Sequence, residues 1–120
     1  MNRETPSNEP LRRAEIRQGG VCAGFLDESR DGSWTFNYLP DYSGPPVSLT
    51  MPVRGEAYWF SGFPPVFEGL LPEGPQLEAL LRKHKIDRND AFRQLVTVGA
   101  DLVGSLTVRE VGSGTLEERD

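Results

Sequence analysis

The sequence predicts an α+β domain in which two to three short helices cover a small, mostly antiparallel sheet of about four to five strands. In the first half of the chain, apolar and polar residues alternate, which is typical of strands with one buried face. In the second half the apolar spacing changes to i, i+3, i+4, the period of an amphipathic helix, before a last alternating segment. Strands followed by helices favour separate β and α layers around one core.

The length of 120 residues fits one domain with a single hydrophobic core. Residues 1–10 contain two prolines and no periodicity, so we expect a flexible N-terminal arm there. Residues 112–120 begin with Gly and Ser and end in charged residues, which is typical of a flexible acidic tail. The folded domain is therefore expected at residues 11–111.

The first two expected strands form a hairpin. The segment VCAGFLDE (21–28) precedes SWTFNYL (33–39), which directly follows Asp31-Gly32, a dipeptide that favours hairpin turns. The second segment carries three aromatic residues of one parity, which predicts an aromatic face: Trp34, Phe36 and Tyr38.

A third strand is expected at VSLTMPV (47–53), at or near an edge of the sheet because proline cannot donate to a ladder. Its alternation predicts one face made of Val47, Leu49 and Met51.

Two short helices are expected on either side of Pro72. Phe67, Leu70 and Leu71 have helical spacing, and the pattern repeats at Leu77, Leu80 and Leu81. Such a spacing places each apolar set on one helix face.

A further helix is expected at residues 87–99, with Asp87 as a plausible N-cap and Gly99 as its stop. The alternating segment LVGSLTVREV (102–111) then predicts a final strand that returns to the sheet.

Composition and charge exclude several function classes. Thirteen Lys and Arg stand against 18 Asp and Glu, so the net charge of −5 opposes direct nucleic-acid binding. With Cys22 as the only cysteine, no intramolecular disulfide and no Cys-based zinc site can form. No signal-peptide pattern and no long apolar run occur, so we expect a cytoplasmic protein with no membrane contact.

No catalytic constellation can be read from the chain. His84, the only histidine, lies near the end of an expected helix, where a cation interacts well with the helix dipole. Cys22 lies in an apolar strand and is interpreted as a small packed residue. The glycines match no phosphate-binding or dinucleotide-binding motif. We therefore expect no enzyme activity, no cofactor and no metal.

The segment AYWFSGFPPVF (57–67) is the strongest candidate for function. A domain of this size cannot easily bury so many aromatic side chains from one stretch, and exposed Trp and Tyr beside rigid prolines are typical of protein-binding hot spots. The alternative is that the segment folds back over the sheet. The predicted partner-binding residues are Tyr58, Trp59, Phe60, Ser61 and Phe63.

Several motifs, in order, are similar to those of one family. They are AGFLDE, WTFNYLPDY, PVSLTMPVR, PPVFEGLLPEG and VGADLVGSLTV. Together they resemble the N-terminal subdomain of HipA-type serine/threonine kinases, the toxins of bacterial toxin–antitoxin systems, over about residues 19–110. The resemblance implies that Phe67, Leu70 and Leu71 are core contacts, and it transfers no catalytic role.

The resemblance also implies a partner. Phosphoryl transfer needs a phosphate-covering loop, a lysine and two aspartates in fixed roles, none of which this chain contains. A subdomain without its kinase resembles HipS, the small protein of tripartite HipB–HipS–HipT systems, which counteracts the toxin. The implied partners are a HipT-like serine/threonine kinase and, in a ternary complex, a helix-turn-helix HipB-like DNA-binding protein.

Three hypotheses follow. The first is an antitoxin that docks where the missing subdomain would sit and inhibits the kinase, with Trp59 as anchor and Phe60 and Phe63 beside it. The second is a scaffolding or activating subunit, which predicts the opposite effect on phosphorylation. The third is a remnant of a HipA gene with no partner.

Overall fold

The computed structural model describes residues 10–102 and 104–111. The predicted tail at 112–120 lies outside the described residues, as does the predicted arm except for Pro10. The elements, in chain order, are β1 (Arg12–Gln18), β2 (Val21–Glu28), β3 (Trp34–Tyr38), β4 (Tyr58–Phe60), α1 (Pro65–Glu68), α2 (Gly74–His84), α3 (Ala91–Thr97) and β5 (Leu106–Val111).

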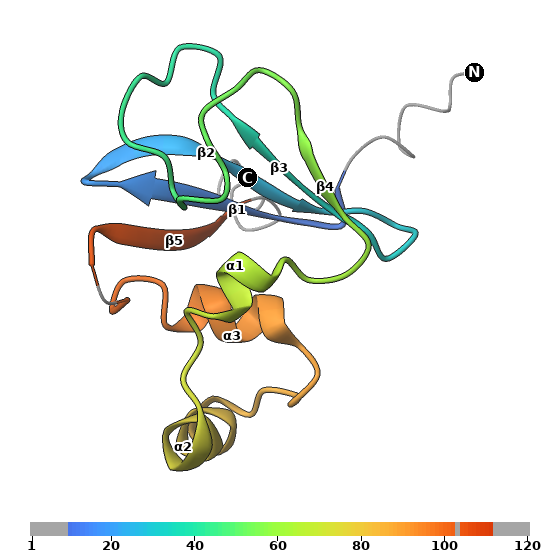
Figure 1. Cartoon of the computed structure of the whole chain (residues 1–120). Coiled ribbons are helices and arrows are strands. Elements are labelled where there is room, and N and C mark those ends of the chain that lie inside the picture. The colour runs from blue at the N-terminus through green and yellow to red at the C-terminus, as the bar shows by residue number, and fades with distance from the viewer. Residues whose placement is uncertain (1–9, 103, 112–120) are drawn as a thin grey trace, which may run out of the picture.

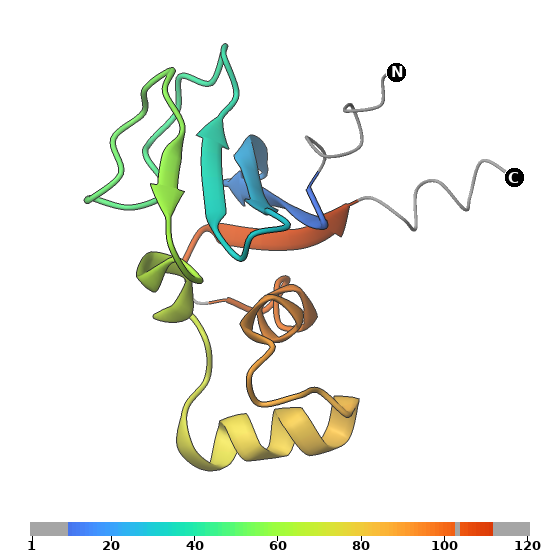
Figure 2. The same cartoon turned by 90° about the vertical axis from the view of Figure 1, so that its right-hand side faces the viewer.

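The five strands form one antiparallel sheet in the order β4-β3-β2-β1-β5. The first four strands are neighbours in sequence, whereas β5 comes after all three helices and pairs with β1 at the far edge. Figure 1 shows the helices together beneath the sheet, and Figure 2 shows the same arrangement from the side. The predicted α+β class is confirmed.

Strand β1 was not expected from the sequence, because RRAEIRQ is mostly charged. Its alternation is nevertheless that of a strand, since Ala14 and Ile16 are fully buried between charged residues. Gly19 and Gly20 connect it to β2 with φ values of 60° and 85°. A two-residue hairpin turn of this kind needs the left-handed conformation at both positions, which glycine adopts at little cost.

The predicted strand at 47–53 is wrong. The segment contains only an isolated bridge between Ser48 and Met51, whose N–H donates to the Ser48 carbonyl at 3.0 Å. Val47 and Met51 are buried, but Leu49 is 97% exposed at the turn between them. A tight turn reverses the chain within four residues, so alternation in sequence does not place these side chains on one face.

The helices differ from expectation mainly at their boundaries. α1 ends at Glu68, and Leu70 and Leu71 pack on the core from the turn that follows it. α3 begins at Ala91, and its N-cap is Asp90 rather than Asp87. The Asp87 carboxylate instead accepts the N–H of Asn89 in the preceding turn. The final strand starts at Leu106, four residues later than predicted.

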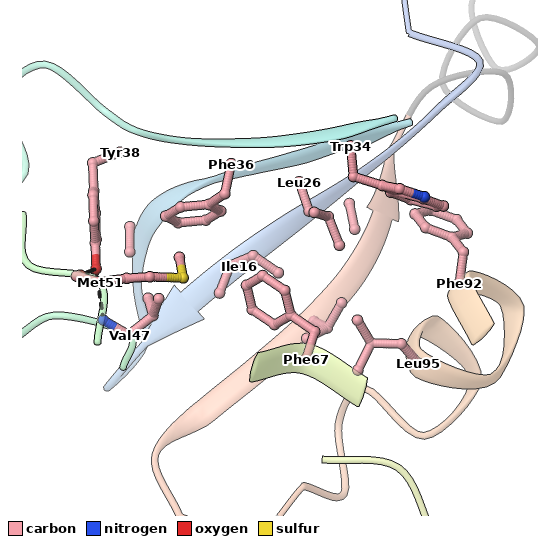
Figure 3. Close-up of a cluster of buried hydrophobic side chains, with 13 residues drawn as sticks. Ile16, Leu26, Trp34, Phe36, Tyr38, Val47, Met51, Phe67, Phe92 and Leu95 are labelled. Carbon is pink, nitrogen blue, oxygen red and sulfur yellow. Dashed lines mark hydrogen bonds between the residues drawn. The ribbon is translucent and has the colours of Figure 1, made fainter. Parts of the chain in front are cut away.

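The core lies between the sheet and helices α1 and α3 (Figure 3). The predicted aromatic face of β3 is confirmed, since Trp34, Phe36 and Tyr38 are all buried. Phe67 of α1 reaches the Phe36 ring with centroids 5.8 Å apart, and Phe92 of α3 stacks on Trp34 at the same separation. Core contacts implied for the stretch around residue 67 are therefore present.

Helix α2 lies apart from this core, at the bottom of Figures 1 and 2. Its Leu81 and the following Ile86 are buried but belong to no part of the main cluster. Within the described ranges, none of the helices is long and apolar enough to span a bilayer.

Candidate protein-docking surface

Strand β4 divides the predicted partner-binding residues between two faces of the sheet. Tyr58 and Phe60 lie opposite Phe36 and Trp34 and therefore turn toward the core. Trp59 lies opposite Thr35 and points to the other face. Its side chain is 65% exposed, which is unusual for a tryptophan.

The two residues after β4 also have different environments. Ser61 is exposed at the turn, whereas Phe63 is half-buried. The Phe63 ring packs edge-to-face on Trp34 with centroids 5.0 Å apart. Of the five predicted residues, the structure thus presents Trp59 and Ser61 at the surface, and it packs the other three aromatic residues against the core.

Tyrosine hydroxyls fix the long segment between β3 and β4. The buried Tyr38 hydroxyl accepts the N–H of Val47 at 2.9 Å and donates to the carbonyl of Met51. Burial raises the pKa of Tyr38, so the phenol keeps the proton that it donates. The Tyr58 hydroxyl donates to the Pro52 carbonyl, and the Arg54 guanidinium lies 3.6 Å from the Tyr58 ring centroid. Strand β4 is thereby held firmly although it has only three residues.

The face of the sheet that carries Trp59 is polar. Arg13 of β1 forms a two-bond ion pair with Asp27 of β2, with N···O distances of 2.7 and 3.0 Å. The Glu15 carboxylate accepts from Arg17 at 3.0 Å and from Arg109 of β5 at 2.6 Å. The signal for this face was present in the sequence, because the charged residues of RRAEIRQ alternate with Ala14 and Ile16.

Glu15 is charged despite being only 7% exposed. Burial by itself pushes its pKa up, but hydrogen bonds from Arg109, Cys22 and Arg17 outweigh burial and hold the pKa below its usual value. The pKa of the neighbouring Cys22 thiol is raised, by burial and by the Glu15 carboxylate. A neutral thiol is a poor nucleophile, which agrees with a packing role for Cys22.

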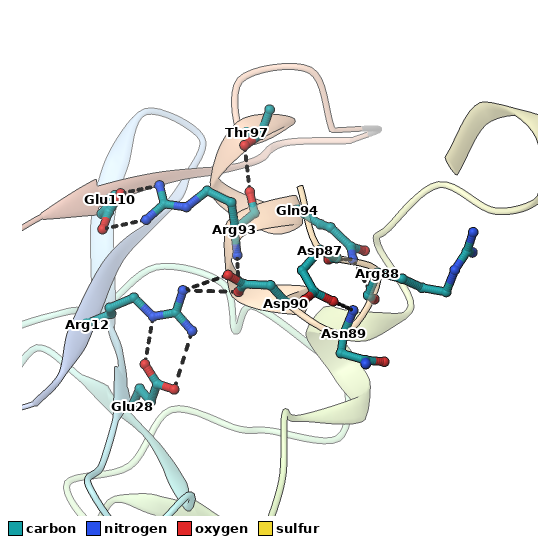
Figure 4. A network of polar contacts seen from close by, with 10 residues as sticks. All are labelled: Arg12, Glu28, Asp87, Arg88, Asn89, Asp90, Arg93, Gln94, Thr97 and Glu110. Carbon is teal, nitrogen blue, oxygen red and sulfur yellow. Dashed lines mark hydrogen bonds and ion pairs between the residues drawn. The ribbon is translucent and has the colours of Figure 1, made fainter. Parts of the chain in front are cut away.

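A second ion network fastens α3 to the opposite face of the sheet (Figure 4). The Arg12 guanidinium donates to Glu28 at 2.7 Å and to Asp90 at 3.0 Å, and it lies 4.6 Å from the Phe92 ring centroid. The pKa of Arg12 is raised, chiefly by the hydrogen bond to Glu28. Gln94, also buried, donates to the carbonyls of Asp87 and Arg88 and secures the loop before α3.

Hollows open on the surface of the part of the chain that the structure describes. One, of about 660 Å³, is lined by residues that include Gln18, Cys22 and Tyr42. Another, of about 410 Å³, is lined by residues that include Arg12, Phe63 and Asp90. Neither contains a histidine, and in the described part of the chain no group of three His, Cys, Asp or Glu residues could hold a metal ion.

Comparison with known proteins gives three concordant similarities. Residues 14–109 match the profile of the HipA N-terminal domain family. An uncharacterized protein of Haemophilus influenzae is 31% identical over 100 residues, which cover 83% of this chain and 93% of that protein. Among solved structures, the N-terminal domain of HipA toxin matches with a TM-score of 0.68 and 28% identity, over 88% of this chain and 98% of that one.

The family match includes all five strands in part or whole and all three helices. The order of motifs that suggested the family thus coincides with elements of one packed domain. The chain belongs to the HipA N-terminal domain family.

Proposed function

We propose that this protein is an antitoxin that binds a HipA-like serine/threonine kinase of the HipT type and suppresses its activity. It would dock where the N-terminal domain of a complete HipA sits. The observation that carries the proposal is the exposed Trp59 on a domain of this family. A large aromatic side chain, held outward on a fixed strand, loses little conformational entropy on binding.

The similarity of whole domains supports this function. The relative from Haemophilus influenzae is matched over 93% of its length, so a chain of this extent occurs elsewhere as a protein of its own. The solved domain described as part of HipA toxin is matched over 98% of its length. These coverages support a partner role for a domain with this fold, and in the proposed ternary complex a HipB-like helix-turn-helix protein would supply DNA binding.

In the proposed contact, Trp59 is the anchor residue that the kinase buries, and Ser61 lies beside it at the surface. Tyr58, Phe60 and Phe63 support the anchor from the core side by fixing β4 against Phe36 and Trp34. Their role in binding is indirect, because their rings are packed within the domain.

Co-expression with the HipA-like kinase of the same organism tests the function. We expect restored growth, a stable complex on size-exclusion chromatography and reduced kinase autophosphorylation. Binding with undiminished or increased autophosphorylation would make the protein a scaffolding or activating subunit. Failure to bind would reject both roles.

Trp59→Ala tests the anchor. We expect a loss of kinase affinity of at least tenfold, since hot-spot tryptophans contribute about 2 kcal/mol or more, with unchanged thermal unfolding. Val21→Ala is the matched control, because Val21 is an apolar strand residue with a similar exposure of 59%. Equal affinity of Trp59→Ala and the unaltered protein would contradict this assignment.

A further inference from the structure

We propose that the whole open face of the sheet, and not only the segment around β4, is the surface that meets the kinase, and that the kinase presents carboxylates to it. This inference rests on the proposed function and specifies the chemistry of its interface. It concerns the face opposite to the helices (Figure 2).

The strand register places Trp59 at the end of a continuous row on this face. Side chains of residues that pair directly across strands point to the same side of a sheet. Trp59 pairs with Thr35, Thr35 with Asp27, and Asp27 with Arg13. The next row of the same face joins Asn37, Phe25, Glu15 and Arg109. A partner that receives Trp59 therefore lies beside these rows.

On this face the acidic groups are buried beneath the arginine side chains. The acidic side chains lie deep, with exposed fractions of 9% for Glu15 and 13% for Asp27. The arginines that cover them are more exposed, at 40% for Arg13, 36% for Arg17 and 71% for Arg109. A partner surface consequently meets guanidinium groups first, on a protein whose net charge is −5.

The guanidinium groups are also oriented in advance. Arg13 is held by its two bonds to Asp27, and its guanidinium carbon lies 4.6 Å from the Phe25 ring centroid. Fixed donors lose less side-chain freedom when they bind an acceptor. The two bonds use Nε and Nη2 of Arg13, so its Nη1 group can donate to a carboxylate of the partner.

The modest net charge of the face favours an acidic protein over a nucleic acid. Three arginines stand here against two carboxylates, so a polyanion would find little net positive charge. Local pairing with a few carboxylates needs no such excess. Trp59 would then enter an apolar pocket whose rim is acidic.

Opposite charges at Asn37 test the proposal. Asn37 is exposed on this face, and among the described residues its side chain makes no hydrogen bond. Asn37→Glu and Asn37→Arg both add bulk, but only the first adds a charge that repels carboxylates. Gln76→Glu and Gln76→Arg, at an exposed position of α2, are the matched controls.

Affinity for the HipA-like kinase of the same organism would be measured for all four variants after their folding is verified by circular dichroism. We expect Asn37→Glu to weaken binding at least tenfold, Asn37→Arg to leave it unchanged or tighter, and the Gln76 variants to have no effect. If both Asn37 variants weakened binding equally, the proposal that the partner presents carboxylates would be overturned. If neither variant changed the affinity, the proposal that this face of the sheet meets the kinase would be overturned, while the proposed function would stand. If the unaltered protein did not bind the kinase, the proposed function would be overturned together with this inference. Tight binding of a single-stranded DNA oligonucleotide through this face would overturn the inference that the partner is an acidic protein.

Discussion

At the scale of single residues, the chain shows how much depends on which face of the sheet a side chain occupies. Trp34 and Trp59 lie on neighbouring strands, where Trp34 pairs with Phe60 and Trp59 pairs with Thr35. Trp34 is 7% exposed and packs against the rings of Phe63 and Phe92, whereas Trp59 is 65% exposed. Similar residues thus lie in opposite environments: Trp34 packs in the core, whereas Trp59 is exposed and is the residue we propose for recognition.

Glu15 gives a prediction about acid stability. Its pKa in the folded state lies below that of an ordinary glutamate, about 4.3, because arginine hydrogen bonds outweigh burial. Its ionised form therefore stabilises the fold above that pH, and the contribution is lost as the pH falls through the folded-state pKa. We expect Glu15→Gln to lower the free energy of unfolding at pH 7 by about 1–3 kcal/mol.

Urea denaturation at pH 7 and near pH 3 measures this effect. The difference between Glu15→Gln and the unaltered protein should shrink at the acidic pH. A difference that is the same at both pH values would show that the ionised carboxylate is not the source of the stabilisation. Glu110→Gln, which removes a more exposed carboxylate on the helix side, is the control.

At the scale of elements, short segments are positioned by specific contacts more than by their own propensity. β4 has three residues and α1 four, fewer than a stable isolated hairpin or helix requires. Tyrosine hydroxyls hold the segment before β4, and Phe67 anchors α1 in the core. At the β5 edge of the sheet, the carbonyl of Gly99 accepts the N–H of Val108, so the backbone after α3 covers part of β5.

Asp90 combines two stabilising contacts that substitutions can separate. Its carboxylate accepts the Arg93 N–H at 3.0 Å as the N-cap of α3 and pairs with Arg12 at 3.0 Å. Asn retains the cap without the charge, whereas Ala removes both. We expect Asp90→Ala to be less stable than Asp90→Asn by about 1 kcal/mol, and both to be less stable than the unaltered protein.

Thermal unfolding at low and high salt measures the contributions of the N-cap hydrogen bond and of the ion pair with Arg12. The differences between each variant and the unaltered protein should decrease at high salt, because salt screens the ion pair. The difference between Asp90→Ala and Asp90→Asn should persist, because it reports the cap. If the two variants had equal stability, the capping contribution would be refuted.

At the scale of the whole molecule, the domain consists of one main core and a loosely attached helix. The sheet, α1 and α3 share a cluster that runs from Met51 to Leu95, as Figure 3 shows. Helix α2 has only Leu81 buried and lies away from the sheet. Regions with few buried apolar contacts open at lower free energy than the core.

Amide hydrogen exchange should therefore distinguish α2 from the sheet. We expect the amides of α2 to exchange at least tenfold faster than those of β1 and β2 under native conditions. Exchange by nuclear magnetic resonance at neutral pH measures this, and the amides of α3 serve as a helical control. Equal protection in α2 and the sheet would indicate that both unfold only together.

The sequence by itself determined the α+β class, the hairpin of β2 and β3 and the aromatic face of β3, because local periodicity and turn dipeptides define them. The Phe67 contacts followed from the family resemblance. The strand at β1, the turn at residues 48–51 and the exact start of α3 were decided only by tertiary structure.

The placement of the candidate site residues was also decided by tertiary structure, because it depends on strand register. An aromatic run signals buried area, but the side of the sheet to which Trp59 points is set by its pairing with Thr35, a residue 24 positions earlier (59 − 35). The arginine-covered face likewise joins β1, β2 and β5 from opposite ends of the chain. Contacts between distant segments are absent from local pattern, so only the folded sheet could reveal that these residues form one surface.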